Sequence, residues 1–184
     1  MKSNYTQIYA LLEKVTPLQA DCGKLCNKAC CEGGEDTGMH LFPGEEVMFE
    51  NESNWMVMKD TDLSYGENKN IKLAVCKGEC IRGKRPLGCR IFPLTPYISE
   101  EENLIIKMDP RAKVRCPLAD HTTINKLQPS FITAVKKAIE MLVQDNEVKA
   151  FMKYISREID RYQETHFYRL ANSRYKKKRM IPRR

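Results

Sequence analysis

Apolar residues recur at helical spacing near both ends of the chain and alternate with polar residues only in its middle part. In residues 4–15 the apolar positions lie three or four apart, which predicts a short amphipathic helix. A longer stripe begins at Pro129 and marks one helix face over about four turns. Asp145 and Asn146 interrupt this stripe and can cap a second helix. The pattern therefore predicts two C-terminal helices whose apolar faces pack in a core.

The middle of the chain predicts short strands and turns. Residues 71–76 alternate apolar and polar as a strand should, and residues 104–108 form a second candidate strand, whereas residues 55–58 alternate only weakly. Residues 41–46 predict a turn that leads into a short helix with acidic residues in its first turn. Residues 82–93 contain two prolines and two glycines, which exclude a long regular element and suggest loops held by something external.

Composition indicates a soluble globular protein of 184 residues, with 42% hydrophobic and 30% charged residues. A core of that size needs no disulfides. The N-terminal residues have no sustained apolar run, and no stretch approaches the roughly 18 apolar residues of a membrane span. We therefore expect no signal peptide, no membrane contact and a cytoplasmic location, where thiols stay reduced.

The net charge of +7 belongs to one end of the chain. Residues 174–184 carry seven basic side chains and no acidic one, and we expect this basic tail to be frayed. The remaining 24 basic residues equal the 24 acidic residues in number. The folded body therefore has no net charge that would attract it to a polyanion.

Eight cysteines are the most concentrated chemical feature, and four of them fall within residues 22–31. Disulfides are disfavoured by the expected compartment and by the strained ring that an adjacent Cys30–Cys31 disulfide would close. Scattered buried thiols would sit in apolar runs, but Lys, Asn and Glu residues surround this cluster. Metal ligation explains the pattern best. The candidate ligands are Cys22, Cys26, Cys30, Cys31, Cys76, Cys80, Cys89 and Cys116.

Helix geometry limits how the first four thiols can share a metal. In one straight helix Cys22 and Cys26 would lie about 6 Å apart along the axis, and Cys30 would lie about 12 Å from Cys22. Thiolates around one zinc ion lie under about 4 Å from each other. Either the segment is not one straight helix, or Cys30 and Cys31 serve another centre or point apart. Eight thiols could fill two zinc sites, or one iron–sulfur cubane and a second site, and all-cysteine ligation suits both metals.

The order of the motifs resembles a known family. Cys22-x3-Cys26-x3-Cys30-Cys31 is followed by Leu-Phe-Pro-Gly-Glu-Glu in residues 41–46, then by Cys76, then by Arg-Pro-Leu-Gly-Cys-Arg-Ile-Phe-Pro in residues 85–93. Over roughly residues 20–120 this series is similar to the zinc- or iron-chelating CxxCxxCC domain family of the YkgJ type. The resemblance implies a metal or iron–sulfur site that uses Cys22, Cys26, Cys30, Cys31 and Cys89, with Cys76 as a further ligand.

This chain departs from that family in having three residues inside its first spacings and in the additional Cys80. Which of Cys30 and Cys31 binds, and whether one or two centres are present, therefore stays open. Arg85 and Arg90 flank Cys89, where they could offset the negative charge of thiolates, or could be surface charges beside a proline-fixed loop.

Taken together, these features predict an α+β fold in which a small, irregular, cysteine-rich metal-binding domain with short strands is covered by two C-terminal helices. We divide the chain into four parts: an N-terminal helix in residues 1–19, a cysteine-rich zinc- or iron-chelating domain in residues 20–120, a C-terminal helical part in residues 121–173, and the basic tail.

Three functions compete. The first is a metal-binding protein whose iron–sulfur cluster or zinc centre has a structural or redox role, with a redox or protein partner left open. The second is a redox or modification enzyme, for which no hydrolase, zinc-protease, P-loop or dinucleotide-binding motif is present, so that no catalytic residue can be named. The third is nucleic-acid binding through the basic tail, which the neutral body argues against.

Overall fold

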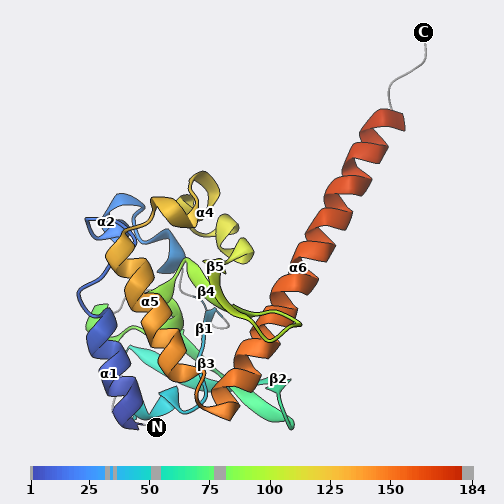
Figure 1. Cartoon of the computed structure of the whole chain (residues 1–184). Helices are drawn as coiled ribbons and strands as arrows, with labels where there is room; N and C mark the ends of the chain where they lie inside the picture. The colour runs from blue at the N-terminus through green and yellow to red at the C-terminus, as the bar shows by residue number, and fades with distance from the viewer. Residues whose placement is uncertain (1, 32–33, 35–36, 51–54, 77–81, 180–184) are drawn as a thin grey trace.

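The computed structural model describes residues 2–31, 34, 37–50, 55–76 and 82–179. Its fold is α+β with short strands and two C-terminal helices, which confirms the predicted fold class (Figure 1). The helices are α1 (Lys2–Leu12), α2 (Cys22–Leu25), α3 (Leu87–Ile91), α4 (Pro117–His121), α5 (Pro129–Leu142) and α6 (Asn146–Arg179). The strands are β1 (Gly38–His40), β2 (Met56–Tyr65), β3 (Lys69–Cys76), β4 (Leu94–Ile98) and β5 (Leu104–Met108). Short 3₁₀ turns are η1 (Ala29–Cys31), η2 (Glu45–Met48), η3 (Arg82–Lys84), η4 (Pro110–Val114) and η5 (Ile124–Lys126).

The strands form two small antiparallel sheets. One sheet has the order β1-β3-β2, and its register places Gly38 opposite Val75 and Met56 opposite Cys76. The close approach of β1 to β3 requires a glycine, because a Cβ at Gly38 would lie 2.3 Å from the Ala74 carbonyl oxygen. The other sheet is the β4–β5 hairpin. The predicted strands in residues 71–76 and 104–108 are confirmed, whereas β4 was not predicted and β2 is longer than its weak alternation indicated.

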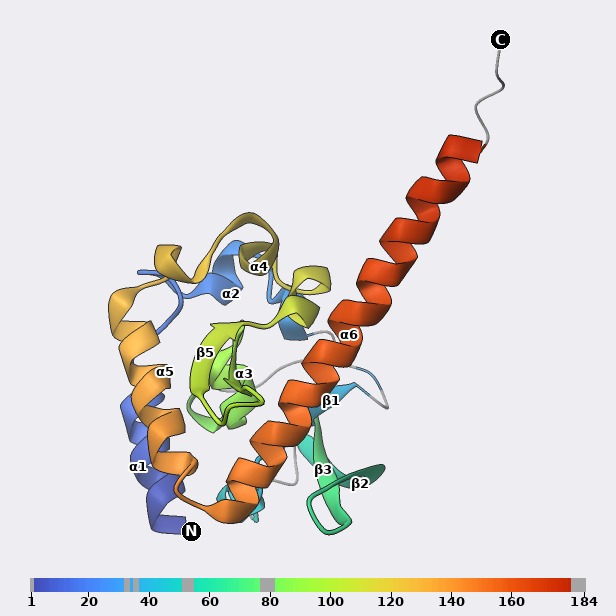
Figure 2. The same ribbon diagram turned by 45° about the vertical axis from the view of Figure 1, so that its right-hand side comes forward.

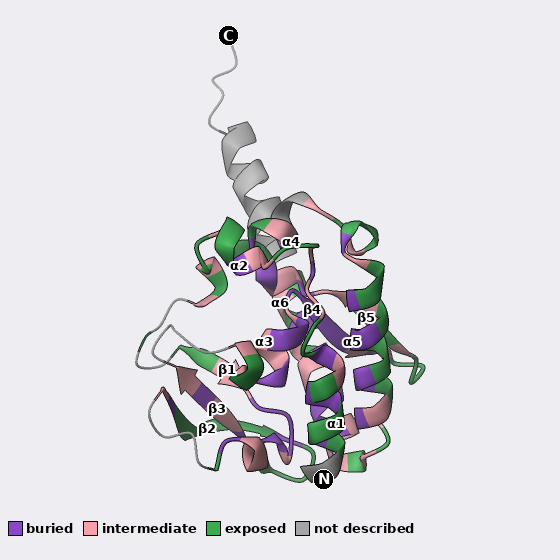
Figure 3. Ribbon diagram, turned by 90° about the vertical axis from the view of Figure 1, so that its left-hand side faces the viewer, coloured by how far each residue is buried: buried purple, intermediate pink, exposed green. Residues whose placement is uncertain are grey.

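The core is one cluster in which α1 and α5 pack against each other and to which α3, both sheets and the first part of α6 also contribute buried side chains. Both helices present one apolar face to it, and in Figure 3 buried and exposed positions alternate along each of them. Fully buried side chains include Tyr5 and Ile8 of α1 and Phe131, Val135 and Ile139 of α5. The apolar stripe predicted from Pro129 is therefore confirmed as core packing.

Helix α6 begins at the predicted cap. The Asp145 side chain accepts hydrogen bonds from the backbone N–H groups of Glu147 and Val148, at 2.8 and 3.2 Å. The first part of α6 packs against β4, and the second part extends away from the body (Figures 1 and 2). The helix continues to Arg179, so residues 174–179 of the basic tail, which we expected to be frayed, are helical. Lysine and arginine are good helix formers, which explains why the basic residues continue the helix.

Within the described ranges, no helix combines the length and the apolarity that crossing a membrane would require.

Replacing Phe131 by alanine should lower the free energy of unfolding by about 3–5 kcal/mol, because this side chain is 0% exposed and its removal leaves a cavity in the core. Chemical denaturation followed by far-UV circular dichroism measures the change. The matched control is Lys136→Ala on the exposed face of the same helix, where the side chain is 68% exposed and the expected change is within about 0.5 kcal/mol. Similar losses in both variants would contradict the assigned core face of α5.

Candidate metal centre

The segment that carries the first four cysteines changes direction in its middle. Helix α2 ends at Leu25, and the next residue, Cys26, has already left the helical conformation. Asn27 and Lys28 follow with φ angles of 49° and 56°, in the left-handed region, and η1 comes next. The segment is therefore not one straight helix, which is the first of the two alternatives that the cysteine spacing left open. This turn brings Cys30 back toward the cysteines of α2.

Two adjoining cavities are lined by cysteine side chains. We name the larger one, of about 330 Å³, the Trp55 cavity and the smaller one, of about 200 Å³, the Cys116 cavity. The cysteines that line the Trp55 cavity are Cys30, Cys31, Cys76 and Cys89. Those that line the Cys116 cavity are Cys22, Cys26, Cys30, Cys89 and Cys116. All seven cysteines among the described residues thus border one cavity or both, and none of them forms a disulfide. Cys80, which the sequence placed in the same set, lies outside the described residues.

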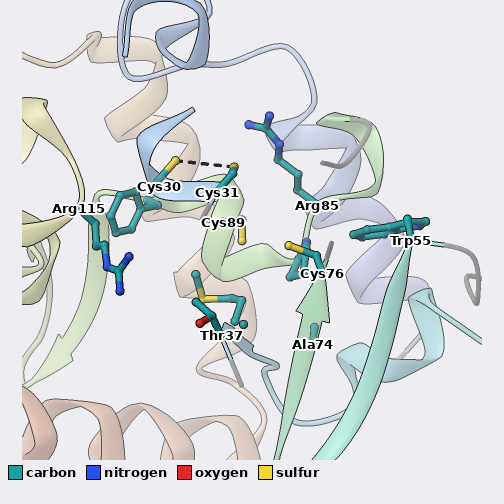
Figure 4. Close-up of a pocket in the computed structure, with 13 residues that line it drawn as sticks. Cys30, Cys31, Thr37, Trp55, Ala74, Cys76, Arg85, Cys89 and Arg115 are labelled. Atoms are coloured by element: carbon teal, nitrogen blue, oxygen red, sulfur yellow. Dashed lines mark hydrogen bonds between the residues drawn. The ribbon is translucent and has the colours of Figure 1, made fainter. Parts of the chain in front are cut away.

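Distant parts of the chain contribute these thiols. Cys76 is the last residue of β3, Cys89 lies in the middle of α3, and the buried Cys116 precedes the first residue of α4. Figure 4 shows the sulfur atoms of Cys76 and Cys89 turned into the Trp55 cavity, with Cys30 and Cys31 on the side that η1 forms. Elements far apart in sequence therefore surround the two adjoining cavities.

Cys30 and Cys31 already have a separation that suits a shared metal ion, because their Sγ atoms are 3.9 Å apart. Sulfurs bonded at about 2.3 Å to a tetrahedral ion lie about 3.8 Å from each other. Among the described residues, however, no three His, Cys, Asp or Glu side chains are grouped closely enough to hold a metal ion. Rotation of a cysteine between staggered χ1 rotamers moves its sulfur by roughly 3 Å, so ligation would require such rotations or small loop shifts.

The contact between the adjacent thiols of Cys30 and Cys31 gives them different pKa values. The contact between the two sulfurs lowers the pKa of Cys31 to about 6 and raises the pKa of Cys30. Burial opposes the effect at Cys31, whereas the positive charges of Arg85 and Lys28 add to it. Cys31 is consequently the thiol of this pair that ionises first, and the thiolate is the form that binds metals.

The two arginines that flank Cys89 have different roles. Arg85 borders both cavities, and its charge helps to lower the pKa of Cys31, which favours the charge-offset interpretation. Arg90 is 5% exposed, so it is not a surface charge. Its guanidinium donates hydrogen bonds to the Arg85 carbonyl at 2.8 Å and to the Gly83 carbonyl. Arg90 therefore holds the turn before Cys89 in place.

Several residues of the cavities were not identified from the sequence. Met39, Trp55 and Phe92 supply apolar walls to the Trp55 cavity, and Arg115 borders both cavities. Arg82 lines the Cys116 cavity and also donates a hydrogen bond to the Val15 carbonyl. Nothing in the local pattern links these positions, because they meet only through long-range packing.

Comparisons with protein-family models, curated proteins and solved structures found no match for this chain. The resemblance to the CxxCxxCC family therefore stays a prediction from its motifs.

In protein stripped of metal and kept reduced, alkylation of Cys31 should reach its plateau at lower pH than an ordinary thiol allows, because its pKa lies near 6. The measurement is iodoacetamide labelling across a pH series, with each cysteine read by peptide mass spectrometry. Cys30→Ala removes the sulfur that contacts Cys31, and the Cys31 profile should then move to higher pH. A Cys31 profile that Cys30→Ala leaves unchanged would show that the two thiols are not coupled.

Proposed function

We propose that this protein binds an iron–sulfur cluster through cysteines at the junction of the Trp55 and Cys116 cavities, with a structural or electron-transfer role. The observation that carries this proposal is the gathering of all seven described cysteines around two cavities that share Cys30 and Cys89. Side-chain packing alone does not require thiols to meet from four separate places in the chain, at residues 22–31, 76, 89 and 116. Soft thiolate ligands select zinc, copper(I) or iron–sulfur clusters.

The size of the cavities favours a cluster over one zinc ion. Four thiolates around zinc lie about 3.8 Å from each other and leave no space between them. The Trp55 cavity alone holds about 330 Å³, with four cysteines in its wall. In an iron–sulfur cluster the cysteines bind different irons and stand around inorganic sulfides, so the group fills a larger space. To bind a single zinc ion, the cysteines in these walls would have to move much closer together.

The charges around the cavities suit a negatively charged group. Four arginines line the Cys116 cavity, and two of these also line the Trp55 cavity. Among the residues that the structure describes, no carboxylate borders either cavity. A thiolate-ligated cluster carries net negative charge, and positive charge and hydrogen bonds near its sulfurs raise its reduction potential. The arginines here would favour thiolate formation and a bound anion.

Anaerobically purified or reconstituted protein should contain iron and acid-labile sulfide in comparable amounts, with the broad visible absorption of a cluster. Elemental analysis and a sulfide assay measure this. Cys89→Ser should lower both contents together, because Cys89 borders both cavities and an oxygen is a poor ligand for a cluster. Lys136→Ala on α5 is the control, and it should retain the wild-type content. A colourless protein with one equivalent of zinc would overturn the cluster, and absence of all metals would overturn the proposal.

Trp55 gives an independent optical report, since it is the only tryptophan in the chain and it lines the larger cavity. Its fluorescence should fall strongly when the cluster is assembled, because a visible-absorbing cluster nearby accepts the excitation energy. The matched control is the same protein incubated with Zn²⁺, a d¹⁰ ion that has no redox chemistry and should quench little. Cluster assembly without quenching would place the cluster away from the Trp55 cavity.

A further inference from the structure

Glu45 is an acidic side chain with no access to solvent. It is 0% exposed, and it lies in the first turn of η2, the short helix that the sequence predicted after residues 41–44. Its carboxylate accepts hydrogen bonds from the Tyr9 hydroxyl at 2.6 Å, from Phe42 N–H at 2.9 Å and from Leu87 N–H at 2.5 Å. Burial raises the pKa of Glu45, an effect that these three bonds and the nearby Arg90 oppose. A buried carboxylate is tolerated only where such donors compensate it.

The bond to Leu87 connects Glu45 to the helix that carries a candidate ligand. Leu87 is the first residue of α3, and Cys89 lies two positions later. The residue before the helix, Pro86, offers no side-chain cap. The first N–H groups of a helix have no partner within the helix, so a partner from elsewhere is needed when they are buried. Glu45 supplies that partner from a part of the chain 42 residues away.

Arg90 extends the same connection from α3 to the N-terminal helix. Its guanidinium lies over the Tyr9 ring, 4.0 Å from the ring centroid, and donates to the Tyr9 carbonyl at 3.4 Å. The same guanidinium holds the carbonyls of Gly83 and Arg85, in the turn that leads to α3. Helix α1, the turn before Glu45 and the segment that carries Cys89 therefore meet in one buried network.

We propose that Glu45 is a positioning residue of the thiol site: it fixes the start of α3, and thereby the direction in which Cys89 enters the two cavities. The inference rests on the proposed function in so far as Cys89 is a ligand. Helix α1 contributes no residue to either cavity, so its effect on the site would pass through Tyr9, Glu45 and Arg90.

The test compares Glu45→Gln with Glu46→Gln, its neighbour that faces Lys72 at the surface. An amide has one acceptor oxygen, so Glu45→Gln leaves Phe42 N–H or Leu87 N–H facing an NH₂ group. In metal-free, reduced protein, native-state alkylation of Cys89 should rise roughly two- to tenfold, the range expected when one hydrogen bond is lost. Cys22 and Cys26, which lie in and beside α2, serve as internal references and should change little.

If Glu45 only stabilised the fold, Glu45→Gln would raise the alkylation rates of all cysteines together. That result would overturn the inference, and so would an unchanged alkylation rate at Cys89. Tyr9→Phe removes a single donor and should give a smaller change in the same direction, which keeps the test decisive if Glu45→Gln does not fold. After reconstitution, Glu45→Gln should also show an altered visible spectrum, whereas Glu46→Gln should match the wild type. If the wild type takes up no iron, the proposed function fails, but the alkylation pattern still decides the role of Glu45.

Discussion

Burying the Glu45 side chain constrains how this chain packs, because a carboxylate removed from water is costly unless hydrogen-bond donors compensate it. The donors come from α1, from the turn at residues 42–45 and from the start of α3. These three segments must therefore be in place together. The segments of this network also contribute to the apolar core, and α3 carries Cys89 to the two cysteine cavities.

The cysteine-bearing half has much less to hold it. Its regular elements are short: α2 has four residues, α3 and α4 have five each, and β1 has three. Segments of this length have no stability of their own and depend on tertiary contacts. Hydrogen bonds from Arg82 and Arg90 to main-chain carbonyls supply some of those contacts. A metal group bound to several of these segments would supply the rest, as structural metals do in small domains.

Sequence reasoning succeeded where the determining pattern is local. The periodicity of α5, the Asp145 cap and the β3 and β5 strands each depend on a few neighbouring residues, and each was predicted. Strand β4 was missed because it is buried on both faces, so it lacks alternation, and because it contains Pro96. The burial of Glu45 could not be predicted, since its donors Tyr9 and Leu87 are 36 and 42 residues away. For the same reason, the sequence allowed the cysteines to be named as a set, but it did not allow their distribution over two cavities to be predicted.

The backbone conformation between Cys26 and Cys30 is a separate argument that the thiols bind a common ligand. The left-handed conformation costs a side-chain-bearing residue roughly 1–2 kcal/mol, which asparagine tolerates better than lysine does. Asn27 and Lys28 both adopt it, and hydrogen bonds from Lys28 N–H to the Gly23 carbonyl at 2.8 Å and from Cys31 N–H to the Lys28 carbonyl at 2.6 Å offset some of that cost. The turn buries no large apolar side chain, since Leu25 beside it is 69% exposed. The turn brings Cys30 to the cavity that Cys22 and Cys26 line. A common ligand for these thiols would explain why the chain adopts a strained backbone at this point.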